Sequence, residues 1–345
     1  MSHMLDEIHQ QPNTIARLIE SERKPAEGLA VDIERRGIDL VIMAARGTSG
    51  HAAIYGKYLL QVNNALPVAL ADCSIFTLYS AEPALERALV IGVSQSGKAT
   101  DVGEYLKRSR ELGALTAAVT NEPGSALTRN ADHTILCHAG KEVAVAATKT
   151  YTATLAAFYL LSAAISHDEG RLARLSACAD AMRSAFAVES YIAEKAERYR
   201  YMESGAVIAR GFNYCTALET ALKLAETSYV GMRGYSAADF LHGPVAIVHE
   251  GYPCILIAPP GKAYRTMFDM AARLRDLRAE TMIISSEDEV LSLATTPVRL
   301  EVQVDEQLSP LVYVIANQLF AYYLAVARGR DPDNPRGLSK VTLTR

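Results

Sequence analysis

Short apolar runs alternate with longer amphipathic segments along most of the chain, and this alternation predicts the fold class. The apolar runs begin at Leu40, Ala88, Leu115, Thr134, Ala206, Cys254, Thr281 and Val298. Most of these runs end in small polar residues, after which apolar positions recur with helical spacing. Short apolar strands that alternate with helices are typical of a parallel sheet covered on both faces. The pattern therefore predicts an α/β protein.

One interruption divides this alternation into two halves. Residues 168–202 are charged and helical in pattern, without a strand signal, and the alternation restarts at Ala206. The halves share the same order of strand, small polar turn and helix, which predicts a duplicated unit. The expected organisation is a leading helix (1–27), a first domain (28–168), a helical linker (169–202), a second domain (203–330) and a tail (331–345) that is either a disordered end or an ordered lid.

Periodicity predicts helices at the edges of these domains. Residues 4–23 repeat apolar residues at helical spacing, whereas residues 151–165 and 311–327 are almost wholly apolar. Both apolar stretches fall short of the roughly 20 residues that a membrane span needs, so we expect core helices. The first 36 residues are polar and charged throughout, unlike a signal peptide. A cytoplasmic location is therefore expected.

Composition narrows the range of functions. The chain has 345 residues, of which 50% are hydrophobic and 21% charged, and its formal net charge is −4. A mildly acidic chain argues against a nucleic-acid binder that relies on a basic surface. The five cysteines never form a C-x-x-C pair, which excludes a disulfide framework and a zinc knuckle and fits a reducing compartment. They are Cys73, Cys137, Cys178, Cys215 and Cys254.

Two turns of the first half are candidates for binding a phosphate. Residues 46–50 and 94–98 each follow a predicted strand, offer small and hydroxyl-bearing residues, and begin a helix. Backbone N–H groups and the helix dipole favour a phosphate at such a place. A single turn of this kind would fit ordinary N-capping, but two in one domain favour phosphate binding. The G-x-G-x-x-G and Walker lysine patterns are missing, so a dinucleotide or nucleoside triphosphate is not indicated.

The second half offers a row of charged residues on one helix. Glu219, Lys223 and Glu226 follow the spacing i, i+4, i+7, which places them on one helix face. That face is either a solvated ion-pair stripe or, if buried near a site, the place of a proton shuttle. His242 beside a turn and Lys340 near the C-terminus are, taken alone, ordinary structural and surface residues.

Six short motifs in one order resemble a known family. They are Gly47-Thr48-Ser49, Ser94-Gln95-Ser96-Gly97, residues 145–149 (VAATK), Glu219 to Glu226 (ETALKLAE), His242-Gly243-Pro244 and residues 335–340 (PRGLSK). This set resembles the double sugar-isomerase (SIS) domain family, in particular the isomerase half of the glutamine–fructose-6-phosphate amidotransferases and the SIS-type glucosamine-6-phosphate deaminases. The resemblance implies two flavodoxin-like domains, each a mainly parallel sheet between helices, related by pseudo-twofold symmetry.

The resemblance also implies a role for each motif. Glu226 would move a proton between C1 and C2 of the sugar, with Glu219 and Lys223 as supporting residues. His242 would help to open the sugar ring from the neighbouring subunit of a homodimer, and Lys340 would form or assist a Schiff base under an ordered tail. The residues that would hold the phosphosugar are Gly47, Thr48, Ser49, Ser94, Gln95, Ser96, Thr100, Val145 and Ser339. No metal, organic cofactor, nucleic acid or membrane is called for.

The chain departs from the family pattern at several positions. A glutaminase domain is missing from the sequence, and unusual residues stand at Arg46, Lys98, Ala99, Ala147 and Arg233. The expected function is a glucosamine-6-phosphate/fructose-6-phosphate isomerase that uses free ammonia or deaminates. A fructosamine-6-phosphate deglycase and a non-catalytic sugar-phosphate regulator are the alternatives. The joint presence of Glu226, His242 and Lys340 favours an enzyme.

Overall fold

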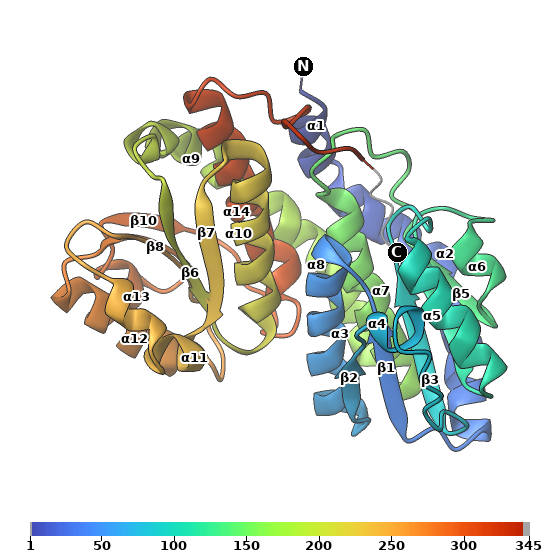
Figure 1. The fold of residues 1–345 in the computed structure, drawn as a ribbon. Coiled ribbons are helices and arrows are strands. Elements are labelled where there is room, and N and C mark those ends of the chain that lie inside the picture. Colours follow the sequence, from blue (N-terminus) through green and yellow to red (C-terminus); the bar gives the residue numbers. More distant parts are fainter. Residues whose placement is uncertain (1, 341–345) are drawn as a thin grey trace. The chain divides into compact units, whose positions relative to one another are not determined.

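Two five-stranded parallel sheets form the framework of the structure, a computed structural model that describes residues 2–340 (Figure 1). The first sheet has the order β2-β1-β3-β4-β5 and the second the order β10-β9-β8-β6-β7, which is the same order read in the opposite direction. The strands of the first sheet are β1 (Leu40–Ala44), β2 (Val68–Leu70), β3 (Ala88–Val93), β4 (Leu115–Thr120) and β5 (His133–Leu136). Those of the second are β6 (Ser204–Ala209), β7 (Gly231–Ser236), β8 (Pro253–Ile257), β9 (Glu280–Ser285) and β10 (Thr296–Arg299). The predicted duplicated α/β fold is confirmed.

Helices cover both sheets and explain why the central strands are apolar. Every residue of β3, β4 and β8 is buried, as expected for parallel strands covered on both faces. The helices are α1 (His3–His9), α2 (Gln11–Arg35), α3 (Gly47–Asn64), α4 (Ser74–Thr77), α5 (Thr100–Glu111), α6 (Ala126–Arg129), α7 (Lys149–Ile165), α8 (Glu169–Ala185), α9 (Glu189–Ala196), α10 (Tyr214–Ser228), α11 (Ala237–Leu241), α12 (Tyr264–Asp276), α13 (Asp288–Leu291) and α14 (Ser309–Ala327). Short 3₁₀ turns lie at Phe186–Val188, Glu197–Tyr199, Gly211–Asn213 and Pro244–Ile247.

The chain divides into two compact units, each with one sheet. One unit comprises Asn13–Glu142, Lys149–Ser176 and the tail from Ser339 onward. The other comprises the residues up to Pro12, Val143–Thr148 and Ala177–Leu338. The boundaries expected for the leader, the linker and the tail stay predictions.

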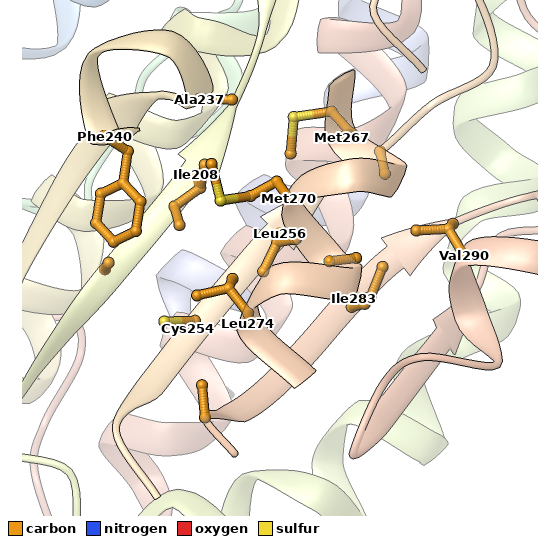
Figure 2. Close-up of a cluster of buried hydrophobic side chains, with 14 of the residues drawn as sticks. Ile208, Ala237, Phe240, Cys254, Leu256, Met267, Met270, Leu274, Ile283 and Val290 are labelled. Carbon is orange, nitrogen blue, oxygen red and sulfur yellow. The ribbon is translucent and has the colours of Figure 1, made fainter. Parts of the chain in front are cut away.

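The second sheet shows how one apolar face is filled. Ile208 of β6, Leu256 of β8 and Ile283 of β9 pack against Met270 and Leu274 of α12 (Figure 2). All five side chains are buried, and the apolar residues of α12 recur at helical spacing. Burying a side chain of this size contributes about 1.5–3 kcal/mol, so α12 is held mainly by this face.

Three elements differ from the sequence expectation. The leading helix does not end near Lys24 but continues as α2 to Arg35, because Leu29 and Ile33 carry its buried face beyond the charged residues. The last strand ends at Arg299 rather than at Val304, because the chain beyond it turns toward α14. The strands β2 and β7 lie at sheet edges and carry too weak an apolar pattern to be predicted.

The helix α14 is the longest apolar helix of the described chain. By length and composition it could cross a membrane, but 78% of its most apolar window is buried inside the protein. Buried core helices pass the same test, so this is a weak indication of a membrane span. The expectation of a core helix over residues 311–327 fits this burial.

From the turns after β1 and β6 to the loops after β3 and β8, the two domains correspond residue by residue at a fixed distance along the chain. The helices α3 and α10 end in left-handed residues, Ala65 (φ 54°) and Tyr229 (φ 57°), which lie 164 positions apart. Both donate their N–H to a carbonyl five residues earlier, that of Leu60 and that of Leu224. The same distance separates Arg46-Gly47 from Arg210-Gly211 in the preceding turns. A residue of one domain can therefore be compared directly with its counterpart in the other.

Candidate functional site

The first domain carries its candidate residues at the point where the strand order reverses. The chain leaves β1 toward β2 on one side and continues from β3 to β4 on the other, while β1 and β3 are neighbours. Loops that follow such adjacent parallel strands form the usual ligand crevice of this kind of sheet. The residues that the structure brings together there are Gly47, Thr48, Ser49, Ser94, Gln95, Ser96 and Thr100.

The loop after β3 has a backbone that allows little variation. Ser94 is 7% exposed and donates its N–H to the Val119 carbonyl at 3.1 Å, which extends the sheet by one residue. The Ser96 hydroxyl accepts the N–H of Lys98 at 3.3 Å. Gly97 has φ +60°, and a Cβ there would lie 2.2 Å from the Ser125 hydroxyl oxygen. Only glycine fits this turn, so the hydroxyls before it are held by a defined backbone.

An ion pair joins the two loops. Arg46 donates through Nε to Asp101 Oδ2 at 2.9 Å, and Asp101 is buried at the start of α5. The other oxygen of Asp101 accepts the N–H of Val102 at 2.9 Å. Arg46 thus places a cation beside the crevice, a role that the sequence did not suggest, since the residue stood out there only as a departure from the family pattern.

The tail lysine meets a buried carboxylate in the same unit. Lys340 Nζ lies 2.8 Å from Glu142 Oε2, and the Glu142 side chain is fully buried. Glu142 also accepts the N–H of Thr150 at 3.1 Å and its hydroxyl at 2.7 Å. This carboxylate therefore holds Lys340 and caps the start of α7 at once. Glu142 was missed in the sequence, although its place just beyond the strand at 133–136 could have pointed to it.

The charged row on α10 is buried, not solvated. The Glu219 and Lys223 side chains are 0% and 1% exposed, while Glu226 is 21% exposed. Lys223 Nζ lies 3.3 Å from Glu219 Oε1 and 2.5 Å from Glu226 Oε2. Burial alone lowers the pKa of Lys223, but the two carboxylates outweigh it, so the pKa lies above its ordinary value. The interpretation as a solvated stripe is wrong.

The chemistry of this row is asymmetric. Glu219 and Lys223 are closed off from solvent, and of the three side chains only that of Glu226 is partly exposed. A charged lysine below it fixes the position of that carboxylate through a charge-assisted hydrogen bond. Glu226 is therefore the member of the row that a ligand could meet.

The remaining candidates, two in this unit and one in the other, lie on other elements. His242 is exposed and follows α11, with its N–H bonded to the Asp239 carbonyl at 3.1 Å. Val145 is partly buried, and its N–H points to the Asp333 carbonyl at 3.5 Å. Ser339, the last candidate, is exposed and belongs to the same unit as Lys340. The structure thus sorts the candidates into two sets, one in each unit.

The tail that precedes Lys340 is anchored on α10. Arg330 and Arg336 both stack on the ring of Tyr229, and the N–H of Arg336 donates to the Tyr229 hydroxyl at 2.8 Å. Asp333 accepts N–H groups of His3 at 2.9 Å and of Met4 at 2.7 Å. Residues 330–336 are therefore held in place by specific contacts. One of their partners, Tyr229, lies three positions after Glu226.

Four of the five cysteines are poor candidates for a nucleophile. Burial raises the pKa of Cys73 to about 11 and of Cys137, Cys178 and Cys254 to about 12. Thiols with such pKa values are poor nucleophiles at neutral pH. Among residues 2–340, no group of three or more His, Cys, Asp or Glu side chains could hold a metal ion.

Two doubly wound domains, the first of which carries hydroxyl-bearing loops at its strand-order reversal, define a class of α/β proteins suited to small phosphorylated ligands. Within that class, the chain belongs to the SIS domain family. The family model, described as the SIS domain, matches residues 38–164 and 204–328, which contain the two sheets. The expected family is thereby confirmed.

Relatives with known names place the chain more closely. It is 36% identical over 348 residues to the glutamine–fructose-6-phosphate aminotransferase (isomerizing) of Pyrococcus horikoshii, covering 98% of this chain and 57% of that protein. The chain thus spans little more than half the length of the curated relatives that it matches. A crystal structure from Silicibacter pomeroyi, assigned as a phosphosugar isomerase, superposes with a TM-score of 0.87 at 30% identity and covers 96% of this chain and 100% of its own.

A second structure agrees in fold. The C-terminal domain of glucosamine-fructose-6-phosphate aminotransferase from Francisella tularensis has a TM-score of 0.86 at 24% identity, covering 97% of this chain and 98% of its own. The chain is therefore related to sugar-phosphate isomerases and aminotransferases.

Proposed function

We propose that the protein is an enzyme that interconverts glucosamine-6-phosphate and fructose-6-phosphate, with isomerisation as its central step and release or uptake of ammonia coupled to it. The observation that carries this proposal is the α10 row, in which a buried lysine presents one partly exposed carboxylate, Glu226. A protein that only binds sugars has no need for such a carboxylate. The names of its relatives supply the substrate class.

The first domain would bind the phosphate. The hydroxyls of Thr48, Ser49, Ser94 and Ser96 stand at the starts of two helices, where N–H groups and the dipole favour an anion. Binding energy from this remote group then supports the reaction at C1 and C2. Gln95, Thr100, Val145 and Ser339 would complete the contacts with the sugar.

Glu226 would transfer the proton between C1 and C2. Aldose–ketose exchange removes a proton from one carbon, forms an enediol or enolamine, and returns the proton to the neighbouring carbon. A carboxylate partly open to the ligand can do both steps, and Lys223 holds it in place. Glu219 is the second carboxylate beside the single positive charge of Lys223 and is closed off from solvent, so its role would be to support rather than to react.

His242 and Lys340 would act on the carbonyl end of the sugar. His242 would assist ring opening, and Lys340 would add to the keto carbon and lose water to form the Schiff base. The Glu142 contact would hold the Lys340 ammonium until a proton is released from it. Because His242 is exposed at the end of α11, we propose that it serves the site of a second subunit in a homodimer.

The test is a direct assay of ammonia release. Purified protein is given glucosamine-6-phosphate, and ammonia and fructose-6-phosphate are measured together. Lys340→Ala is tested beside it, with Lys141→Ala, an exposed lysine one residue from Glu142, as the matched control. We expect wild type and Lys141→Ala to release both products and Lys340→Ala to release neither. No ammonia from wild type, with sugar phosphates still raising its melting temperature, would overturn the deaminase and point to another amine adduct or a regulator.

The subunit arrangement has its own test. Glu226→Gln and His242→Ala variants, each inactive alone, are unfolded together and refolded as mixed dimers. Random pairing makes half of the dimers mixed. If His242 acts in the partner's site, each mixed dimer has one intact site out of two, so about a quarter of wild-type activity returns. Activity that stays at the level of the separate variants would show that His242 acts within its own chain.

A further inference from the structure

The second domain carries the same phosphate-type loop as the first. Gly97-Lys98-Ala99 follows β3, and Gly261-Lys262-Ala263 follows β8, 164 positions later. Both loops begin identically, since Ser94 and its counterpart Ala258 donate their N–H to the neighbouring strand at Val119 and Ile284. Helices of 12 and 13 residues, α5 and α12, start one residue after each loop. On geometry alone, the chain has two places for an anion.

The place in the second domain is already filled by the protein itself. Glu306 Oε2 accepts the N–H of Lys262 at 2.9 Å, and Oε1 accepts the N–H of Ala263 at 3.1 Å. The carboxylate approaches so closely that a Cβ on Gly261 (φ +138°) would lie 2.4 Å from Glu306 Cδ. Two charge-assisted hydrogen bonds at the start of a helix are the contacts that a phosphate would make.

We infer that Glu306 is an internal anion which replaces a ligand phosphate in the second domain, so that each chain binds one phosphosugar and not two. This inference rests on the proposed function in one respect: the loop after β3 is taken as the phosphate site of the first domain. Glu306 acts as a specificity-determining residue, because it decides which of two equivalent loops is open to the substrate.

Two further observations favour this role. The loop of the first domain offers hydroxyls at Ser94 and Ser96, whereas the counterparts Ala258 and Pro260 offer none, as expected of a loop that holds no exchanging ligand. In the first domain, the carboxylate on the connection that follows the last strand is Glu142, and it bonds to Thr150 and Lys340. In the second domain, the glutamate 164 positions later, Glu306, bonds to the loop itself.

A free phosphate would compete poorly with Glu306. A tethered group acts at an effective concentration on the order of millimolar or higher, and its ordering has been paid for by the fold. In addition, a phosphate next to the Glu306 carboxylate would meet like-charge repulsion. The second loop therefore stays closed at ordinary substrate concentrations.

The experiment follows the backbone amides of both loops. Labelled wild type, Glu306→Ala and Glu301→Ala are titrated with inorganic phosphate and with glucosamine-6-phosphate, and amide shifts of 96–99 and 261–263 are read by NMR. Glu301→Ala is the matched control, because it removes the same charge from the same connection. Glu301 pairs with Arg299 and not with the loop. Wild type and Glu301→Ala should respond only at 96–99, and Glu306→Ala should gain a saturable response at 261–263 to both probes. Glu306→Ser serves as the second variant should the alanine protein fail to fold.

Each outcome decides one question. A response of wild type at 261–263, or a folded Glu306 variant without one, overturns the internal-anion role. Wild type that responds at neither loop contradicts the proposed function, while the gain in Glu306→Ala would still support the role of Glu306.

Discussion

The helices α3 and α10 occupy the same position in the two domains and end in the same left-handed cap, yet they differ completely on one face. Glu219, Lys223 and Glu226 of α10 correspond to Tyr55, Leu59 and Val62 of α3. Tyr55 and Leu59 are fully buried, as are Glu219 and Lys223, so the first domain fills this space with apolar volume and the second with an ion pair.

This difference separates the features that determine the fold from the residues to which we assign chemistry. The strands, the turns and the caps are shared, because they come from apolar burial and backbone geometry. A buried ion pair stabilises a fold no better than well-packed apolar residues of similar size. Stability alone therefore does not account for its presence on α10, which agrees with the role proposed for Glu226.

The largest expected effect comes from removing the reactive end of the α10 row. Glu226→Gln keeps the size and a hydrogen bond to Lys223 but cannot take a proton, so turnover should fall about 10²–10⁴-fold. Phosphosugar binding, measured by calorimetry, should stay within a few-fold of wild type. Glu194→Gln, on an exposed glutamate, is the control. Unchanged turnover in Glu226→Gln would remove this residue from the mechanism.

The next effect is on stability and concerns the middle of the row. Lys223→Met leaves two carboxylates without their shared cation, and breaking a buried pair in this way costs about 3–5 kcal/mol. Denaturant unfolding should show this loss, and adding Glu219→Gln should recover part of it. Lys195→Met, which removes a lysine paired with the exposed Glu194, should change the free energy of unfolding far less, because solvent screens an exposed ion pair. Equal losses for the two lysines would contradict the buried-pair description.

The raised pKa of Lys223 predicts how its contribution to the free energy of unfolding depends on pH. Because its pKa in the folded protein is raised, the contribution of Lys223 is fully present below its unfolded pKa, about 10.4. It is lost only as the pH rises through the higher folded value. The difference in unfolding free energy between wild type and Lys223→Met should therefore be constant from pH 7 to about 10 and shrink above that. A difference that already shrinks near pH 8 would mean a lowered pKa.

The smallest effect separates the two loops. Lys98 and Lys262 are counterparts, and both are exposed. Lys98→Ala should raise KM for the phosphosugar by a few-fold at low salt and less at high salt, because exposed charges are screened. Lys262→Ala should leave KM unchanged, since its loop holds Glu306. An equal rise in both variants would mean that both loops take part in binding.

Much of the fold was predictable because fully buried strands stand out as largely apolar runs in the sequence. The runs at 88–93 and 115–120 are buried along their whole length, so their apolar pattern was clear. The edge strand Gly231–Ser236 was not, because it contains two glycines and an arginine and takes its shape from pairing with β6. The end of α2 was misplaced because charged residues at 20–24 hid the apolar face that continues beyond them.

The candidate site was predictable only in part. The hydroxyl turns could be found, since small residues after a strand are a local signal. The partners of Lys340 and Lys262 could not, because Glu142 lies 198 residues from the first and Glu306 lies 44 residues from the second. Contacts over such distances depend on the whole chain path. The repeated Gly-Lys-Ala at 97–99 and 261–263 was the overlooked local signal.

The fixed distance of 164 residues also records how the two domains diverged. It holds from the turns after β1 and β6 to the loops after β3 and β8, so since their duplication neither copy has gained or lost net length there. Beyond these loops the distance changes: Val119 and Ile284, which accept the N–H groups of Ser94 and Ala258, lie 165 positions apart. Val119 then pairs with Ile135, 16 positions later, whereas Ile284 pairs with Val298, only 14 positions later. Glu142 and Glu306 in the segments that follow are again 164 positions apart, so the two copies keep a glutamate at matching places and differ in its partners: Thr150 and Lys340 in the first, the loop after β8 in the second.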